Sequence, residues 1–411
     1  MPDTGERFAL SASQQNIWDL EQRYSGTSIN VISATVRISG RLDFSLLSKT
    51  LNLILCADAS LRTRLVPDGG RVMQEYSPYT EELFPVFDFS LTDPEGFSHW
   101  ETAMTREPMQ LFDAPLCRFF LFRTGEEQGG LLIKTHHIIF DGWSQVLLCN
   151  RIAETYLALL SSAEPKLSQS PSYAIHIQKE KDYLASSACR ADEAYWRSMM
   201  ETPAEPISFK EQRGASVSPV GRRRSYQLPE ILNHVVVSFC QEHRVSPFAP
   251  YYMALAIAAK RMGAGRRMSI GVPIHNRTDL VARETTGMFV STLPLVTELD
   301  EDWTAEEFND RLSETWLDLL RHQRFPYERI AELPGLDGGR LFKVALSYQD
   351  NLSYKNEDTT VHFSGRWNYG GYQAEQLCIH MTNLEDNRRY TVDYDYLAQL
   401  FTDEEIDRLH R

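Results

Sequence analysis

The chain has 411 residues, of which 42% are hydrophobic and 24% are charged, and its formal net charge is -14 at pH 7. The length predicts two domains of roughly 200 residues each, and the composition is that of a soluble globular protein. The negative charge disfavours nucleic acids and anionic membranes as partners. The lack of a long apolar run predicts no membrane span. Six singly placed cysteines predict reduced thiols in a cytoplasmic protein without a metal site.

The first predicted elements belong to an ordinary α/β pattern. A helix begins after Ser11 and turns Ile17, Trp18 and Leu20 toward the core. Alternating apolar residues then predict a strand near residues 29–38, and apolar residues spaced by four and three predict a helix near residues 47–54.

The next segment carries the chemistry. A short apolar strand, residues 130–135, runs into two histidines, and apolar residues at helical spacing follow from Val146. Residues 136–144 therefore form a strand-to-helix junction, where polar side chains can face a ligand without occupying core positions. Because the unperturbed pKa of histidine lies near neutrality, a histidine pair at this place is suited to proton handling.

A polar stretch rich in serine and proline, residues 161–172, divides the chain. We place the boundary there and predict an N-terminal domain, residues 1–165, and a C-terminal domain, residues 166–411. In the second domain the pattern predicts, in chain order, helices over 173–196, a helix ending at Gly263, a strand over 268–273, a helix with a capping box at Thr304 and Glu307, a buried strand over 341–349, and a hairpin over 377–394 with a polar turn at 385–387.

Several of these segments match motifs of one known family. His136-His137-Ile138-Ile139-Phe140-Asp141-Gly142 has the form His-His-x-x-x-Asp-Gly, and Leu61-Arg62-Thr63, residues 271–277, residues 286–295 and residues 322–328 resemble further motifs in the same order. From about residue 8 to its end, the chain resembles the condensation domains of nonribosomal peptide synthetases, within the chloramphenicol acetyltransferase-like superfamily. The resemblance implies an α/β fold of two chloramphenicol acetyltransferase-like subdomains, a V-shaped pseudo-dimer with a central substrate tunnel.

The resemblance also implies an activity. Such domains join a donor acyl thioester to the amine of an aminoacyl-carrier protein, and both groups are carried by phosphopantetheine or coenzyme A, with no intrinsic cofactor. The implied partners are a peptidyl carrier protein, an acyl-coenzyme A or acyl-carrier donor, and a neighbouring adenylation domain, and we expect a monomer.

The type of condensation domain is a separate expectation. Because the first motif begins a few residues after Met1, we expect a starter domain that N-acylates the first amino acid in lipopeptide biosynthesis. The alternatives are an elongation domain that forms peptide bonds, an ester-forming acyltransferase, or a non-catalytic recruiting domain of the same fold.

The resemblance assigns roles at the junction. It implies that His137 is the catalytic residue, either as a general base or by orienting the amine, and that Asp141 pairs with Arg277 in a structural role. His136 braces the junction. Gly142 either offers its N–H to an oxyanion or serves only the turn.

Six further residues are expected to line the substrate tunnel: Trp143, Ser144, Met288, Phe289, Tyr348 and Gln349. Two alternatives remain open for them. Ser144 could serve only as a helix N-cap, and the four residues from the second half could belong to the core.

Overall fold

The computed structural model describes residues 6–91, 94–210, 217–333, 340–349, 352, 354, 360–384 and 389–411. By its internal contacts the chain divides into two compact units. Unit 1 comprises Met1–Asp182, Arg277–Phe289 and Asn351–Gly370, and unit 2 comprises Tyr183–Asn276, Val290–Asp350 and Gly371–Arg411. These units do not coincide with the predicted boundary at residue 165, because two later segments pack with unit 1. The two predicted subdomains stay a prediction.

The elements of unit 1 are strands β1 (Phe8–Ala9), β2 (Val31–Gly40), β3 (Thr63–Asp68), β4 (Arg71–Tyr76), β5 (Val86–Asp88), β6 (Cys117–Gly125), β7 (Gln128–His136) and β13 (Val361–Trp367), and helices α1 (Ala12–Arg23), α2 (Phe44–Ala57), α3 (Pro94–Arg106), α4 (Gly142–Leu160), α5 (Tyr173–Leu184) and α9 (Leu280–Glu284). Short 3₁₀ helices span Ala59–Arg62 and His137–Ile139. The C-terminal end of α5 continues into unit 2.

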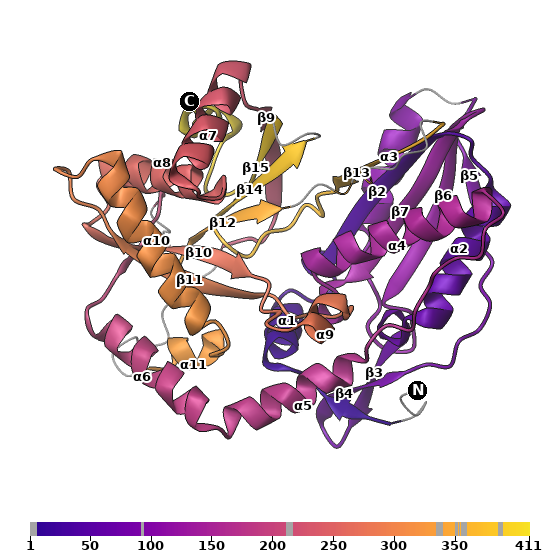
Figure 1. Ribbon diagram of the computed structural model, residues 1–411, viewed down its shortest axis with the longest axis horizontal. Coiled ribbons are helices and arrows are strands. Elements are labelled where there is room, and N and C mark those ends of the chain that lie inside the picture. The colour runs from indigo at the N-terminus through magenta and orange to yellow at the C-terminus, as the bar shows by residue number, and fades with distance from the viewer. Residues whose placement is uncertain are drawn as a thin grey trace. The chain divides into compact units, whose positions relative to one another are not determined.

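The main sheet of unit 1 has the strand order β13-β2-β7-β6-β5, and β1, β4 and β3 form a smaller sheet. Its two faces follow from the alternation along β2. Ala34 and Val36 are buried in the core that α2 and α4 complete, whereas Thr35 on the opposite face hydrogen-bonds Glu101 of α3. Figure 1 shows α4 crossing one face of this sheet, and its N-terminus starts from the end of the central strand β7.

The elements of unit 2 are strands β8 (Glu205–Pro206), β9 (Gly221–Gln227), β10 (Arg267–Ile274), β11 (Ser291–Glu298), β12 (Val344–Gln349), β14 (Leu377–Leu384) and β15 (Arg389–Leu397), and helices α6 (Ser187–Glu201), α7 (Glu230–His243), α8 (Phe248–Arg261), α10 (Ala305–Arg321), α11 (Tyr327–Ala331) and α12 (Asp403–His410). These include the predicted hairpin, β14 and β15, whose turn at 385–387 lies outside the described residues.

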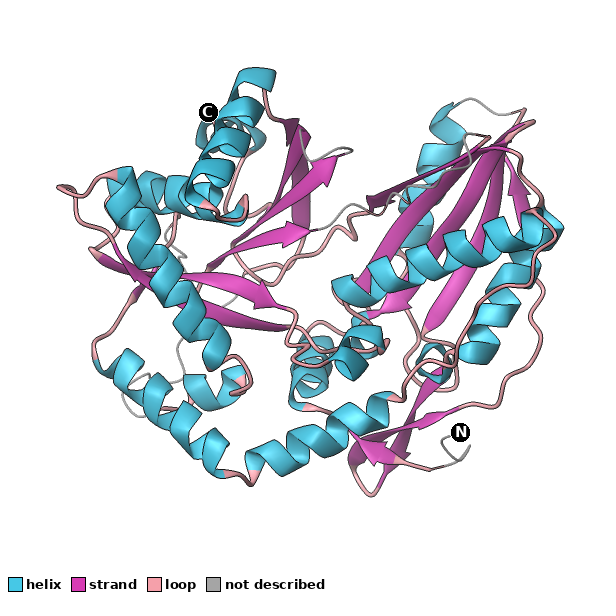
Figure 2. Cartoon of the chain, in the orientation of Figure 1, coloured by secondary structure: helices cyan, strands magenta, loops and turns pink. Residues whose placement is uncertain are grey.

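The sheet of unit 2 has the order β11-β10-β12-β14-β15-β9, with β8 added beside β10. Its core combines apolar residues from the strands with residues of α6, α8, α10 and α12. The expected capping box is confirmed at the start of α10, where Thr304 accepts from the N–H of Glu307 and the Glu307 side chain accepts from the N–H of Thr304. Both units therefore pair a sheet with helices, as Figure 2 shows, and the predicted α/β class is confirmed.

The first helix is present, and Ile17 and Trp18 of its predicted inward face pack against the core of unit 1, although the most buried positions of the helix are polar. Ile17 and Leu20 are only partly buried, whereas Gln14 and Glu21 are buried. Gln14 and Glu21 are buried because hydrogen bonds hold them in the interior. The Gln14 amide donates to the carbonyl of Ile138 at 2.7 Å, and Glu21 accepts from an asparagine of the loop before β2. Among the described residues, no helix is both long and apolar enough to span a bilayer.

Candidate active site

The strand-to-helix junction predicted from the sequence is confirmed. Strand β7 ends at His136, a single 3₁₀ turn follows, and α4 begins at Gly142. Asp141 is the N-cap, because its carboxylate accepts from the N–H of Ser144 at 2.9 Å. The alternative that Ser144 caps the helix is therefore wrong, since Ser144 already lies in the first turn.

Asp141 forms a bidentate ion pair with Arg277. Arg277 Nη1 donates to Oδ2 at 2.7 Å and Nη2 donates to Oδ1 at 3.0 Å, and both side chains are 0% exposed. The N–H of Phe289 donates to Oδ2 at 3.0 Å. Although Arg277 comes from the second half of the sequence, it packs within unit 1, so the pair joins two segments that are far apart in the sequence but belong to one compact unit.

The electrostatics of this pair favour the charged carboxylate. Burial alone would raise the pKa of Asp141, but the charge and hydrogen bonds of Arg277, together with the N–H groups of Ser144 and Phe289, outweigh burial and lower it. The guanidinium lies 4.1 Å from the centre of the Phe289 ring, and Nε donates to the carbonyl of Ala282 at 3.2 Å. A buried charge pair is tolerated where the remaining donors and acceptors are also satisfied, as they are at Asp141.

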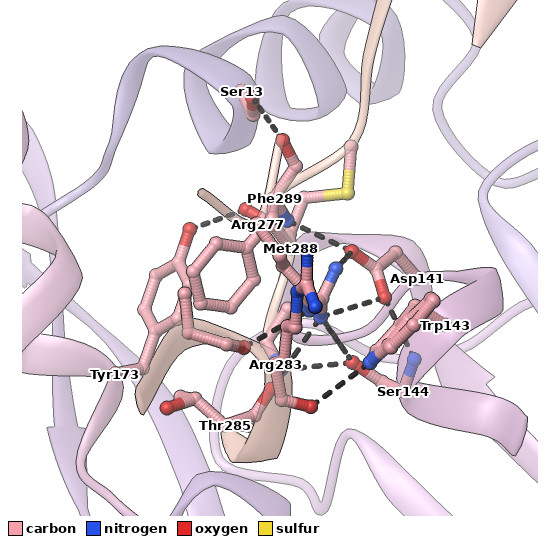
Figure 3. A network of polar contacts seen from close by, with 12 residues as sticks. Ser13, Asp141, Trp143, Ser144, Tyr173, Arg277, Arg283, Thr285, Met288 and Phe289 are labelled. Atoms are coloured by element: carbon pink, nitrogen blue, oxygen red, sulfur yellow. Dashed lines mark hydrogen bonds and ion pairs between the residues drawn. The ribbon is translucent and has the colours of Figure 1, made fainter. Parts of the chain in front are cut away.

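Ser144 connects this pair to the loop that leads to β11. Its hydroxyl donates to the carbonyl of Gly287 at 2.9 Å, accepts from the N–H of Gly287 at 3.0 Å, and lies 3.0 Å from Nη2 of Arg277 (Figure 3). A Cβ on Gly287 would lie 2.1 Å from the ring of Tyr173, so only glycine fits there. The interactions of Ser144 that the structure describes are thus structural.

Tyr173 is the member of this network that sequence reasoning missed. Its hydroxyl contacts the Ser11 hydroxyl at 2.9 Å. The same hydroxyl donates to the carbonyl of Met288, and the ring packs edge-on against Phe289 (Figure 3). Tyr173 opens α5, directly after the serine- and proline-rich stretch. The signal was its position beside a predicted boundary, but a tyrosine at a helix start gives no hint of a distant partner.

The two histidines have different surroundings. His136 is buried, its Nδ1 accepts from the N–H of Ile138 at 3.2 Å, and its Nε2 lies 3.5 Å from a carboxylate oxygen of Glu21. This geometry agrees with a bracing role.

His137 is partly exposed as a residue, but its Nδ1 is buried. Burial lowers the pKa of His137, while the nearby Asp141 carboxylate and backbone hydrogen bonds with His137 itself and with Phe140 act to raise it. The imidazole is therefore neutral at pH 7, which is the state that can accept a proton or a hydrogen bond.

A side chain at Gly142 would meet no close neighbour. It begins α4 without a positive φ, and a Cβ there would meet only a ring carbon of Trp367 at 3.9 Å. The alternative that glycine is needed only for the turn is therefore not supported by the backbone. As the first residue of the helix, Gly142 also has an N–H without an intrahelical acceptor.

The predicted tunnel residues fall into both units. Trp143 donates from its indole to the carbonyl of Arg283 at 2.9 Å, and Met288 and Phe289 are buried in unit 1. For Phe289, packed between Arg277 and Tyr173, this burial agrees with the core alternative.

Tyr348 and Gln349 lie on β12 in unit 2, and both are partly buried. The amide nitrogen of Gln349 lies 3.2 Å from Nδ1 of His380, whose other nitrogen lies 3.3 Å from Asp395. A lining role for the six residues stays a prediction.

Comparisons with known proteins agree on one family. The family model described as Condensation domain matches residues 5–411. The chain is 31% identical to surfactin synthase subunit 1 and 28% identical to a subunit of plipastatin synthase, both of Bacillus subtilis (strain 168), with 98% of this chain aligned in each case. It spans only 11% and 16% of the length of those two proteins.

Solved structures share the fold. The first condensation domain of the calcium-dependent antibiotic synthetase, in complex with a substrate analogue, is 23% identical with a TM-score of 0.87, and covers 99% of this chain and 94% of its own. A variant of the starter condensation domain of rhizomide synthetase, in complex with C8-CoA, is 22% identical with a TM-score of 0.88, and covers 98% and 92%.

Proposed function

Because the chain belongs to the condensation-domain family, we propose that it is an acyltransferase that forms an amide bond between a donor acyl thioester and the amine of an aminoacyl-carrier protein. Both substrates arrive on a phosphopantetheine arm or on coenzyme A. A carrier protein and an adjacent adenylation domain are the proposed partners. The proposed donor is a fatty acyl group, which makes the domain a starter domain; a solved relative of that type carries C8-CoA.

We propose that His137 acts on the amine. A neutral imidazole can accept the proton of the attacking amine or hold that amine by a hydrogen bond, and a positioned base contributes typically about 10²–10⁴-fold to the rate. The nitrogen attacks the thioester carbonyl carbon, a tetrahedral oxyanion forms, and the carbon–sulfur bond then breaks to release the thiol. The observation that supports this role is a partly exposed imidazole whose pKa burial lowers, four residues before Asp141 of the fully buried ion pair.

The remaining residues of the junction position this chemistry. Asp141 and Arg277 fix the start of α4, because the same carboxylate caps the helix and binds the guanidinium. Gly142 is the first residue of that helix, so its N–H has no acceptor within the helix and can stabilise an oxyanion. Asp141 is therefore essential in this proposal without acting as the base.

A single-turnover assay read by mass spectrometry tests the proposal. The domain is mixed with an aminoacyl-carrier protein and a set of acyl-coenzyme A thioesters of different chain lengths, and the His137→Ala and His99→Ala variants are run beside it. His99 is an exposed histidine on α3 of the same unit and serves as the matched control. We expect N-acylated aminoacyl-carrier with the native domain and the His99 variant, and a loss of at least about 100-fold in the His137 variant.

The other outcomes assign the alternatives. Product that forms only when the acyl or peptidyl group is on a carrier protein would replace the starter assignment with a carrier-dependent or elongation domain. An ester product formed from a hydroxyl acceptor, in place of the amide, would assign the domain as an ester-forming acyltransferase. If every donor and acceptor fails with correctly folded protein, the catalytic proposal is wrong and a recruiting role remains.

A further inference from the structure

A second cluster of reactive side chains lies on the sheet of unit 2, and the proposed reaction does not use it. The hydroxyl of Ser347 on β12 lies 2.7 Å from Nδ1 of His380 on β14, and Nε2 of His380 lies 3.3 Å from Oδ2 of Asp395 on β15. Arg223 on β9 donates to both oxygens of that carboxylate, at 2.6 and 2.7 Å. A carboxylate, an imidazole and a hydroxyl in series are the groups that activate a serine as a nucleophile.

Strand pairing brings the three residues of this cluster together. Ser347 and His380 are direct partners in the pairing of β12 with β14, and Asp395 lies diagonally opposite His380 on β15. The residue before each of them belongs to the core that the helices of unit 2 complete: Leu346, Ile379 and Tyr394. Because successive side chains of a strand point to opposite faces, the cluster lies on the face of the sheet opposite that core.

The carboxylate determines which nitrogen of His380 carries the proton. Burial acts to raise the pKa of Asp395, but Arg223 outweighs it and lowers the pKa, so the carboxylate is charged and can only accept. In the neutral imidazole, Nε2 therefore donates to Asp395 and Nδ1 is the acceptor. The hydroxyl of Ser347 then donates to Nδ1, and in this arrangement the imidazole can take the proton of the hydroxyl as the oxygen attacks.

Gln349 supplies a donor for the charge that develops in such an attack. It lies two residues after Ser347 on the same face of β12, and its Nε2 lies 3.2 Å from Nδ1 of His380. Once Nδ1 has taken a proton it can no longer accept, so the amide N–H becomes available to an oxyanion beside Ser347. The side chain of His380 is 22% exposed, so the cluster is not sealed from solvent.

From this cluster we infer that unit 2 carries a second catalytic site, at which Ser347 attacks an acyl thioester and the acyl group is released as a free acid. His380 takes the hydroxyl proton, the carbon–sulfur bond breaks, and the proton leaves with the thiol, so an acyl ester of Ser347 remains. Water then attacks the ester carbonyl and gives a proton to the same imidazole, which returns it to the serine oxygen as the acid departs. Only the choice of a thioester as substrate rests on the proposed function.

Covalent labelling with a fluorophosphonate tests the nucleophile. This probe phosphonylates an activated serine and needs no acyl donor, so its result does not depend on the proposed function. The native domain and the Ser347→Ala, His380→Gln and Ser225→Ala variants are treated with it, and the modified peptides are mapped by mass spectrometry. Ser225 is the matched control, because it is an exposed serine two residues after Arg223 on β9, on the same face of the sheet.

We expect an adduct on Ser347 in the native domain and in the Ser225 variant, and labelling slower by at least about 100-fold in His380→Gln. No adduct on Ser347, or equal labelling of that serine in His380→Gln, would overturn the inference. Thermal unfolding of each variant confirms that the comparison is made on folded protein.

Release of thiol from octanoyl-coenzyme A, measured without any acceptor, tests the reaction itself. We expect slow hydrolysis by the native domain and the Ser225 variant, and a loss of at least about 100-fold in Ser347→Ala. A native domain that releases no thiol, or undiminished release in Ser347→Ala, would overturn the inference. Hydrolysis that is lost in His137→Ala but kept in Ser347→Ala would also overturn it, because the reaction would then belong to the amide-forming site. Amide formation is measured separately in the single-turnover assay, so the two proposals can fail independently.

Discussion

The Asp141–Arg277 pair of unit 1 and the Arg223–Asp395 pair of unit 2 have the same bidentate chemistry but join different kinds of neighbours. Arg223 donates to the two oxygens of Asp395 at 2.6 and 2.7 Å, across strands β9 and β15, where the two residues are already partners in the backbone register. Arg277 and Asp141 belong to no common sheet, and their pair joins the helix cap to a loop. The Arg223–Asp395 pair therefore adds to the backbone hydrogen bonds between two strands, whereas the Asp141–Arg277 pair connects two segments that no strand pairing joins.

Burial sharpens the contrast. The side chains of Arg223 and Asp395 are 18% and 4% exposed, but those of Arg277 and Asp141 are both 0% exposed. Breaking a fully buried pair leaves a buried charge without its opposite charge. The ion pair of unit 1 is therefore needed to hold the residues of the candidate site in place. In unit 2, strand pairing already positions the two residues, and their ion pair only stabilises that arrangement further.

The largest expected effect is the loss of Asp141. In Asp141→Ala, the Arg277 guanidinium stays buried without its carboxylate and the helix loses its cap, so we expect the free energy of unfolding to fall by about 3–5 kcal/mol. Chemical denaturation followed by circular dichroism measures this change. A loss below 1 kcal/mol would contradict the view that the pair holds the junction together.

A smaller effect separates two glycines of unit 1. In Gly287→Ala the new methyl meets the Tyr173 ring, and we expect a destabilisation of about 1–3 kcal/mol. In Gly142→Ala the methyl meets nothing closer than 3.9 Å, so stability should stay within about 0.5 kcal/mol. If the open space receives substrate, however, the rate of amide formation falls in Gly142→Ala. Equal destabilisation in the two variants would show that the two sites are packed alike.

In unit 2, Arg223→Ala should cost less than the loss of Asp141. Asp395 keeps its contact with His380 and its backbone ladder, so we expect a loss of about 1–2 kcal/mol in the free energy of unfolding. The same denaturation experiment applies. A cost equal to that of Asp141→Ala would remove the distinction between the two pairs.

Acidification gives the smallest effect near neutrality. Burial acts to raise the pKa of both Asp141 and Asp395, but the arginine partner outweighs it in each case and lowers the pKa. The stability that a carboxylate with a lowered pKa contributes is fully present above its unfolded pKa of about 3.9 and is lost as pH falls through its folded pKa. We therefore expect neither pair to change the melting temperature between pH 7 and pH 5.

A melting series below about pH 4 separates the native domain from the neutral variants. The native domain should lose stability on further acidification more steeply than Asp141→Asn, with a smaller difference for Asp395→Asn. Identical slopes in all three proteins would contradict the lowered pKa values.

Local pattern was sufficient for some parts of the site and insufficient for others. The β7–α4 junction was predictable because apolar spacing changes from strand to helix within a few residues, and the pairing of Asp141 with Arg277 was implied by the family motifs. The burial of Gln14 and Tyr173 was not predictable, because each is held by a partner far away in the sequence. Periodicity ranks residues by apolar character, so it overlooks a polar side chain that satisfies a distant carbonyl.

The same reasoning explains the wrong cap. Ser144 and Asp141 are both good N-cap residues, and sequence preference alone does not decide between them. The structure decides it, because α4 already begins at Gly142 and the Asp141 carboxylate accepts from the N–H of Ser144.

The interleaving of the two units bears on how such a domain can be cut, shuffled or recombined. A fragment that stops at residue 182 lacks Arg277 and also strand β13, which pairs with β2 along the edge of the main sheet. Residues 1–182 are therefore not an independent folding unit. Exchanging them alone between related enzymes would pair them with a β13 strand and an Arg277 from a different sequence. A chimera that respects the fold must carry residues 277–289 and 351–370 together with the N-terminal portion, as three inserts rather than one crossover.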